Sequence, residues 1–259
     1  MHDRGELATR TCCHKASRQQ QLLTQSIASP NDRSSLIEDR YSSVLEALKR
    51  CAVRARRNPN DIGLLAVSKT RTIDEIRTLA SFGQVDFGEN YVVDALPKIR
   101  ELVPLGLTWH FVGTVQSNKT KLIAQHFDWV HSIDRTSVAR RLNESRHNEP
   151  LNVCIQVNVD DEPQKSGIRK AEAADLVENI QELPRLRLRG LMSIPKVDSD
   201  PEVSRTAFST LYELFHELRP SVSEYWDTLS MGMTSDYEVA IQEGATLVRL
   251  GTALFGPRA

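Results

Sequence analysis

Two kinds of hydrophobic pattern alternate along most of the chain. Short apolar runs, typical of buried strands, are separated by longer segments in which apolar residues recur every three or four positions, as in amphipathic helices. The apolar runs lie at 63–68, 85–88, 108–113, 129–133, 152–159, 186–194, 228–231 and 246–250. The helical segments between them lie at 73–82, 91–102, 119–126, 137–145, 171–183, 202–218 and 237–243. Strict alternation of this kind predicts parallel βαβ units.

A further amphipathic helix is predicted before the first strand, over residues 36–56. Ser35 and Glu38 have the spacing of a capping box, and Asn58-Pro59-Asn60 is a helix-ending sequence. The apolar face of this helix is compatible with an outer barrel helix or with a dimer contact.

The first 33 residues differ in composition, since they are rich in Arg, Gln, Ser and Thr. We expect a disordered or non-native extension over 1–33 and a single folded domain over 34–259. A transit peptide is the alternative, but Asp3 and Glu6 argue against it. No apolar core of a secretory signal is present in this segment.

The predicted fold class is α/β, and two architectures compete for it. A length of 259 residues suits one (β/α)8 barrel of the TIM type. A doubly wound open sheet is the alternative. The alternation never breaks into a run of strands, and no Gly-x-Gly-x-x-Gly follows the first strand, so the barrel is favoured.

Composition and charge narrow the range of partners. Lys and Arg total 33 against 34 Asp and Glu, and this net charge of -1 gives no support to a nucleic-acid or membrane-surface partner. No apolar stretch approaches the roughly 18 residues of a membrane span. The four cysteines have no metal-site spacing, so no metal is expected, and they fit a reducing, cytoplasmic location.

In a barrel of this type the chemistry lies at the C-terminal ends of the strands. Lys69 follows the first apolar run directly, in Ser68-Lys69-Thr70. Partial desolvation there would lower the pKa of the lysine, and a neutral amine can attack a carbonyl to form a Schiff base. The alternative is a surface lysine that begins a loop.

The last two strand ends resemble an anion cradle. Ser230, Gly232 and Thr234 combine hydroxyls with a glycine, and Gly251-Thr252 repeats the arrangement after the eighth strand. Barrels often bind phosphate at these two positions, and Asp236 is expected to start a helix that points at the same place.

Arg249 lies near the end of the eighth strand, where it would bind a ligand or form a structural ion pair. A Schiff-base lysine opposite a phosphate site suits either a sugar-phosphate aldolase or pyridoxal phosphate (PLP). An arginine beside the pyridine nitrogen of PLP would keep that nitrogen unprotonated and weaken the electron sink.

Seven ordered stretches resemble the pyridoxal phosphate homeostasis protein family. They run from Leu65-Ala66-Val67-Ser68-Lys69-Thr70 through Phe87-Gly88-Glu89-Asn90-Tyr91, Trp109-His110-Phe111-Val112-Gly113, Lys165-Ser166-Gly167, Arg189-Gly190-Leu191-Met192 and Leu229-Ser230-Met231-Gly232-Met233 to Val248-Arg249-Leu250-Gly251-Thr252. The resemblance covers nearly the whole chain except the first residues. Thr234 departs from the serine that the family more often has, but it keeps the hydroxyl.

The resemblance implies a barrel like the N-terminal domain of alanine racemase, a PLP fold type III barrel without the C-terminal β-domain. It also implies PLP held as a Schiff base on Lys69, with Arg249 near the pyridine nitrogen, Asn90 beside the ring and His110 behind the residues that touch the cofactor. The full set of implied cofactor-binding residues is Lys69, Asn90, His110, Ser230, Gly232, Met233, Thr234, Arg249, Gly251 and Thr252.

The function implied by the resemblance is PLP binding for vitamin B6 homeostasis and amino-acid balance, without robust catalytic turnover. A low-activity racemase or lyase is the alternative, and a second base such as Tyr91 would favour it. No catalytic residue is therefore assigned. The expected partners are PLP and the apo-enzymes that receive it, and the expected state is a monomer or weak dimer.

Lys165 has two interpretations. It is either a solvated loop lysine or a second contact at the barrel mouth, used in handing the cofactor on.

Overall fold

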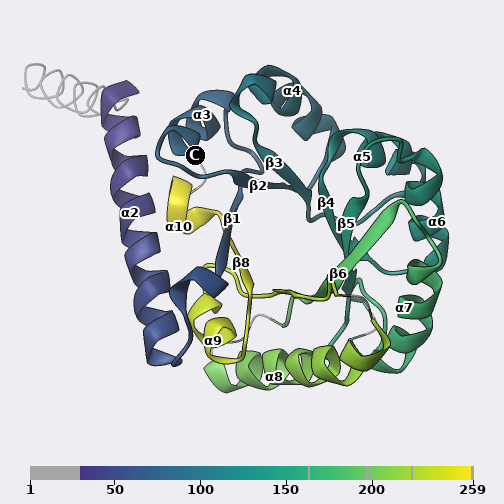
Figure 1. Cartoon of the computed structure of the whole chain (residues 1–259). Coiled ribbons are helices and arrows are strands. Elements are labelled where there is room, and N and C mark those ends of the chain that lie inside the picture. Colours follow the sequence, from purple (N-terminus) through teal and green to yellow (C-terminus); the bar gives the residue numbers. More distant parts are fainter. Residues whose placement is uncertain (1–29, 163, 197, 199, 223, 258–259) are drawn as a thin grey trace, which may run out of the picture. The chain divides into compact units, whose positions relative to one another are not determined.

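The computed structural model describes residues 30–257, except 163, 197, 199 and 223. The strands of this part of the chain form a closed parallel barrel in the order β1 to β8, and Figure 1 shows the helices surrounding it. The strands are β1 (Gly63–Val67), β2 (Asp86–Glu89), β3 (Thr108–Phe111), β4 (Trp129–Ile133), β5 (Leu151–Gln156), β6 (Leu186–Met192), β7 (Thr228–Ser230) and β8 (Leu247–Leu250). The predicted barrel is confirmed, and the open sheet is excluded.

Each predicted helical segment contains a helix. The helices are α2 (Pro30–Arg54), α3 (Ile73–Ser81), α4 (Val92–Leu102), α5 (Thr120–His126), α6 (Thr136–Ser145), α7 (Ala173–Gln181), α8 (Pro201–Leu218), α9 (Tyr237–Gln242) and α10 (Thr252–Phe255). Short 3₁₀ helices add Pro59–Asp61, Val103–Leu105, Ser117–Lys119, Lys170–Glu172 and Arg219–Ser221. Among the described helices, none is long and apolar enough to cross a membrane.

The first helix differs from its prediction at both ends. Its described part begins at Pro30, so the helix extends further toward the N-terminus than residue 36. Ser35 therefore lies inside the helix and does not cap it. The helix ends at Arg54 because Arg56 adopts a left-handed backbone with φ 55°. The prediction for residues 1–29 lies outside the described residues.

From Ile37 onward this helix packs its apolar stripe inward. Ile37, Tyr41, Val44 and Leu48 are all buried, at the spacing of one helix face. The Arg40 guanidinium also donates to the carbonyl oxygen of Phe255 over 3.2 Å. These contacts are those of an outer barrel helix, one of the two predicted uses of this face.

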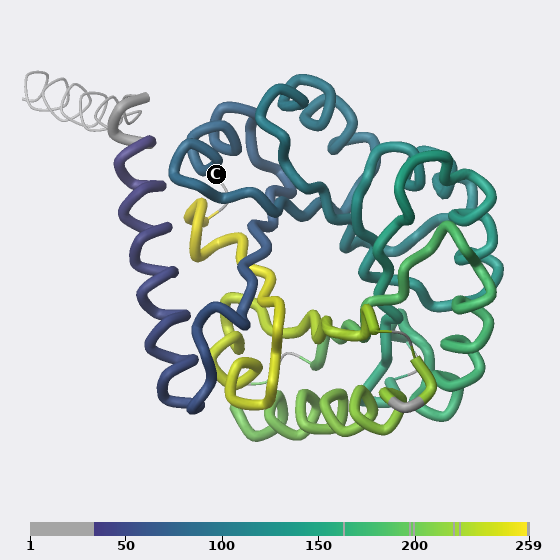
Figure 2. The backbone as a smooth tube through the Cα atoms, in the orientation of Figure 1, coloured from purple at the N-terminus to yellow at the C-terminus, as the bar shows by residue number. Residues whose placement is uncertain are grey.

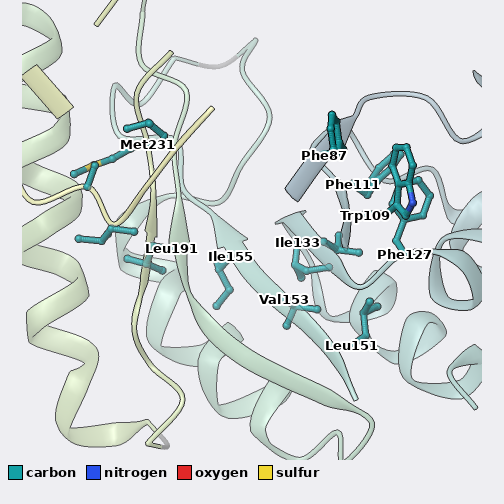
Figure 3. Packing of buried hydrophobic residues seen from close by; sticks show 14 of the residues in the cluster. Phe87, Trp109, Phe111, Phe127, Ile133, Leu151, Val153, Ile155, Leu191 and Met231 are labelled. Atoms are coloured by element: carbon teal, nitrogen blue, oxygen red, sulfur yellow. The ribbon is translucent and has the colours of Figure 1, made fainter. Parts of the chain in front are cut away.

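The main hydrophobic core lies between the strands and the helices. Phe87 and Trp109 pack with ring centroids 5.9 Å apart, and Phe111 and Phe127 pack edge to face at 5.4 Å. Figure 3 shows these four rings gathered at one side of the cluster. Because strand side chains alternate between two faces, the residues next to Phe87, Trp109 and Phe111 face the barrel interior, and several of these are polar.

Parallel pairing closes the barrel between its first and last strands. Gly63 to Ala66 of β1 pair in register with Leu247 to Leu250 of β8. In Figure 2 the yellow end of the tube accordingly runs beside the dark blue first strand. This closure brings the ends of β1, β7 and β8 to one rim of the barrel, where the predicted lysine and anion cradle lie.

Candidate functional site

Lys69 follows β1 at this rim, and three hydrogen bonds fix the residue before it, Ser68. The Ser68 N–H donates to Gly88 O over 2.9 Å, its hydroxyl donates to Glu89 Oε1 over 2.6 Å, and its carbonyl accepts from Lys98 Nζ over 2.9 Å. Thr70 on the other side has φ 65°, a left-handed conformation that is strained for a β-branched residue. Lys69 itself is half-buried. Its backbone therefore leaves the strand in a fixed direction.

Glu89 and Lys98 form a buried ion pair that the sequence analysis missed. Lys98 Nζ lies 2.7 Å from Glu89 Oε1, and their side chains are 9% and 1% exposed. Lys98 lies on the face of α4 that buries Ala95 and Leu102, so a lysine on an apolar helix face was the available signal. The pair anchors the end of β1 from the helix side.

Asn90 follows β2 at the same rim. Its side chain lines a 220 Å³ cavity together with Gln156, Lys165 and Ile194. Asn90 Oδ1 is buried and has no hydrogen-bond partner among the described residues. Tyr91, the candidate second base, is 67% exposed and lines a neighbouring 260 Å³ cavity.

The predicted anion cradle comprises the starts of two helices that follow the paired strands β7 and β8. Gly232 adopts φ 93°, and its carbonyl accepts the Arg249 N–H over 2.9 Å, which joins the two strand ends. The helix α9 begins just after Asp236, as expected, and α10 begins at Thr252. Thr234 and Thr252 are exposed. The first-turn N–H groups of a helix have no intrahelical partner and attract anions.

One donor of the cradle is already engaged. The Met233 N–H donates to Asp236 Oδ1 over 2.6 Å. Burial raises the pKa of the Asp236 carboxyl, while the Met233 N–H and the charge of Arg249 oppose that rise. An anion that uses Met233 must therefore displace this carboxylate.

Arg249 is buried inside the barrel near the rim. Its NH1 donates to Ser230 O over 2.6 Å and to Ser230 Oγ over 2.9 Å, and its NH2 donates to Ser193 O over 2.9 Å. These partners are carbonyls and a hydroxyl, so the predicted alternative of a structural ion pair is wrong for the described residues. Burial lowers the pKa of Arg249 to about 10, and the guanidinium stays charged at neutral pH.

The hydroxyl of Ser230 and the ring of His110 lie deeper than the other predicted residues. Ser230 is fully buried, and its Oγ lies between Arg249 and His131 Nδ1, 2.8 Å away. His110 Nδ1 is 2.9 Å from His131 Nε2. His131 was missed by sequence analysis, although a histidine inside the apolar run 129–133 was a visible anomaly.

Lys165 is partly exposed and ion-paired. Its ammonium lies 2.6 Å from Asp160 Oδ2 and 3.5 Å from Glu162 Oε2, with 24% of the side chain exposed. Asp160 also accepts the Lys196 N–H. The loop after β5 is thus held by this lysine.

Several buried polar atoms at the rim lack a hydrogen-bond partner among the described residues and could bind a ligand. Besides Asn90 Oδ1, the buried atoms Glu89 Oε2, Asn158 Oδ1 and Ser193 Oγ have no hydrogen-bond partner among the described residues. All four follow or end barrel strands on the C-terminal side, where barrels bind ligands. With a lysine, a cationic arginine and two helix starts nearby, the residues fit a small molecule that carries an aldehyde and a phosphate.

Residues 45–259 match the model of the alanine racemase N-terminal domain family. The chain is 49% identical over 226 residues to the pyridoxal phosphate homeostasis protein of Pseudomonas aeruginosa, covering 86% of this chain and 96% of that protein. It is 47% identical over 234 residues to the protein of the same name in Escherichia coli, covering 86% and 97%.

Solved structures are also similar to this chain. PipY of Synechococcus elongatus with PLP bound aligns with a TM-score of 0.74 at 34% identity, covering 85% of this chain and all of that one (100%). The alanine racemase of Corynebacterium glutamicum aligns with a TM-score of 0.63 at 16% identity, covering 87% of this chain and 62% of that one, and shares the fold.

Proposed function

Because this chain belongs to the pyridoxal phosphate homeostasis protein family, built on the alanine racemase N-terminal-domain fold, we propose that it binds pyridoxal 5'-phosphate for vitamin B6 homeostasis and amino-acid balance. PLP is the cofactor of this barrel. The observation that carries the proposal is the position of Lys69 beside the anion cradle. A Cβ added at Gly251 of the cradle would lie 3.1 Å from the carbonyl oxygen of Val67, two residues before Lys69.

We assign the aldehyde end of PLP to Lys69. Its amine is the nucleophile, and the hydrogen bonds of Ser68 together with the left-handed Thr70 keep it directed from the strand end. When bound, PLP supplies an aldehyde for the Schiff base and a ring that withdraws electrons from it. Asn90, with its unpartnered Oδ1, would lie beside the ring.

We assign the phosphate end to the cradle. Gly232, Met233 and Thr234 after β7, and Gly251 and Thr252 before and within α10, offer N–H groups and exposed hydroxyls. Thr234 contributes the hydroxyl that serine supplies more often in the family.

Arg249 would face the pyridine nitrogen. A buried arginine that remains cationic keeps that nitrogen unprotonated, which weakens the electron-withdrawing power of the ring. Ser230 and His110 would act through Arg249 without direct contact with the phosphate, because the Ser230 hydroxyl is already bonded to Arg249 and His131.

The protein would act as a carrier of PLP and not as an enzyme with robust turnover. Its relatives at 44–49% identity are named for homeostasis, and a ring with a weakened electron sink supports binding better than catalysis. We further propose that this protein is a monomer or weak dimer in the cytoplasm. There it would deliver PLP to apo-enzymes that lack the cofactor. The buried free thiols of Cys51 and Cys154 support a reducing location.

An absorption spectrum of the purified protein tests the assignment of Lys69. Wild type loaded with PLP should have a visible band that borohydride converts to a permanent covalent adduct, whereas Lys69→Ala should have neither. Lys165→Ala is the matched control, because it removes another lysine of the rim and should retain both the band and the adduct. A Lys69→Ala variant that still forms the adduct would overturn the assignment.

A second assay separates carrier from enzyme. The PLP-loaded protein should leave L-alanine unracemised while it restores activity to a PLP-free aminotransferase. Racemisation at rates typical of enzymes, about 1 per second or faster, would contradict the carrier proposal.

A further inference from the structure

A continuous line of hydrogen bonds crosses the barrel interior. It runs from Arg249 NH1 to Ser230 Oγ over 2.9 Å, to His131 Nδ1 over 2.8 Å, from His131 Nε2 to His110 Nδ1 over 2.9 Å, and from His110 Nε2 to Asp86 Oδ1 over 3.0 Å. The middle residues are buried, whereas the Asp86 side chain is 43% exposed. Asp86 begins β2, so it lies at the end of the barrel opposite the cofactor rim.

When both histidine rings are neutral, the two ends of this line fix the direction of every bond. A guanidinium can only donate, so Ser230 Oγ accepts from Arg249. An ionised carboxylate can only accept, so His110 Nε2 carries a proton and donates to Asp86. A neutral His110 then accepts at Nδ1 from the protonated Nε2 of His131, and a neutral His131 accepts at Nδ1 from the hydroxyl of Ser230.

A single arrangement therefore satisfies all five groups when both rings are neutral. Burial lowers the pKa of His131 well below its ordinary value, and the nearby His110 and Arg249 lower it further, which agrees with a neutral ring. If His131 carried its proton on Nδ1 instead, Ser230 Oγ would receive two donors, and its own proton would have to turn away from this line.

Resting on the proposed function, we propose that Asp86, His110 and His131 are positioning residues for the PLP site. They act by turning the hydroxyl proton of Ser230 away from Arg249, so that Ser230 Oγ can accept from it. This holds the guanidinium where it meets the pyridine ring. Asp86, at the far end of the barrel, is thus part of the cofactor site without touching the cofactor.

The groups that surround the two rings are compatible with this role. His110 stacks on Trp129 with ring centroids 5.3 Å apart, and Arg189 covers Trp129 at 4.6 Å. The charge of Arg189 is paired with Asp227. Within the described part of the chain, Asp86 is thus the carboxylate that hydrogen-bonds to this line of residues.

Nitrogen NMR of the imidazole rings tests the direction of the line on the full chain without PLP. In wild type at neutral pH, His110 and His131 should both be neutral with the proton on Nε2. The Nδ1–H form of His131 would overturn the proposal, and so would a cationic His131. This measurement does not depend on whether the protein binds PLP.

The variant His110→Phe keeps a ring but removes the acceptor of His131. The proton of His131 should then move to Nδ1, because a buried Nε2–H without an acceptor is costlier than an unused lone pair. After loading, the affinity for PLP should fall about tenfold, in line with the loss of one hydrogen bond to a charged group, and the visible band should shift. The exposed His147→Gln is the control and should change neither.

The two proposals fail in different ways. If wild type has the expected tautomers but takes up no PLP, the proposed function fails. If wild type binds PLP and His110→Phe binds it equally well with an unchanged band, the positioning role is wrong while the function stands. If His110→Phe does not fold, the wild-type tautomers alone still decide whether the line has the proposed direction.

Discussion

At the scale of single residues, the buried ion pair of Glu89 and Lys98 supports the strand end next to the site. Lys98 Nζ bonds to both the Glu89 carboxylate and the Ser68 carbonyl, one residue before the lysine proposed to hold PLP. Removing one partner of such a pair leaves a buried charge, which is costlier than removing both.

Lys98→Met should therefore lower the free energy of unfolding by about 3–5 kcal/mol, as measured by urea denaturation. The double variant Lys98→Met with Glu89→Gln should recover most of this loss, because no unpaired charge remains. Equal losses in the single and double variants would show that the pair acts by packing alone.

The residues missed by sequence analysis share one property. Each has a partner far away in the chain, since Ser230 lies 99 positions from His131 and Ser68 lies 30 positions from Lys98, although Glu89 lies only 9 positions from Lys98. These contacts form only when the strands and helices pack together, so the spacing of residues along the chain does not predict which partner each residue has. The positions of Lys69, Gly232 and Gly251 at strand ends could be predicted, because strand ends and helix starts are visible in the local sequence pattern.

At the scale of elements, the strand boundaries were predicted best where apolar runs have polar borders. The run 129–133 coincides with β4, whereas 152–159 extends three residues past the end of β5 at Gln156. Residues that follow a strand can still be apolar when they line the rim of the barrel. The apolar run in the sequence therefore extends beyond the last residue that pairs with the neighbouring strand. The register shifts between β5 and β6 were likewise invisible in the pattern.

Gly190 of β6 tests the cost of a close approach between neighbouring strands. It has φ 152°, and an added Cβ would collide with the carbonyl oxygen of Thr228 in β7. Gly190→Ala should lower the free energy of unfolding by at least about 3 kcal/mol in thermal or urea denaturation, because backbone cannot move aside cheaply.

Gly83→Ala is the matched control. Gly83 also has a positive φ of 100°, but nothing lies within 4 Å of its added Cβ. It should cost only the backbone strain of about 1 kcal/mol. Similar losses in both variants would mean that the contact with Thr228 is unimportant.

At the scale of the whole molecule, the polar barrel interior makes stability depend on pH. The pKa of His131 is well below 6.5 in the folded barrel because of burial, His110 and Arg249, so the unfolded chain binds a proton that the folded chain does not. Stability should therefore fall as the pH drops below about 6.5, by up to about 1.4 kcal/mol per pH unit from this residue.

Urea denaturation between pH 7.5 and 5.5, on the order of two pH units, would measure this slope. His131→Gln should reduce it by up to one proton, although the variant is less stable throughout. His147→Gln, an exposed histidine, should keep the wild-type slope. A wild-type slope no steeper than that of His131→Gln would contradict the proton linkage.

The pairing of β1 with β8 also governs how the molecule can be made. While a ribosome is still translating the segment before Leu247, the strands already released lack the partner that β1 requires. The growing chain then presents two open sheet edges, which can pair with other chains. Substitutions or slow codons that delay β8 should lower the yield of native protein without changing any native contact, and no equilibrium measurement on the finished barrel would reveal them.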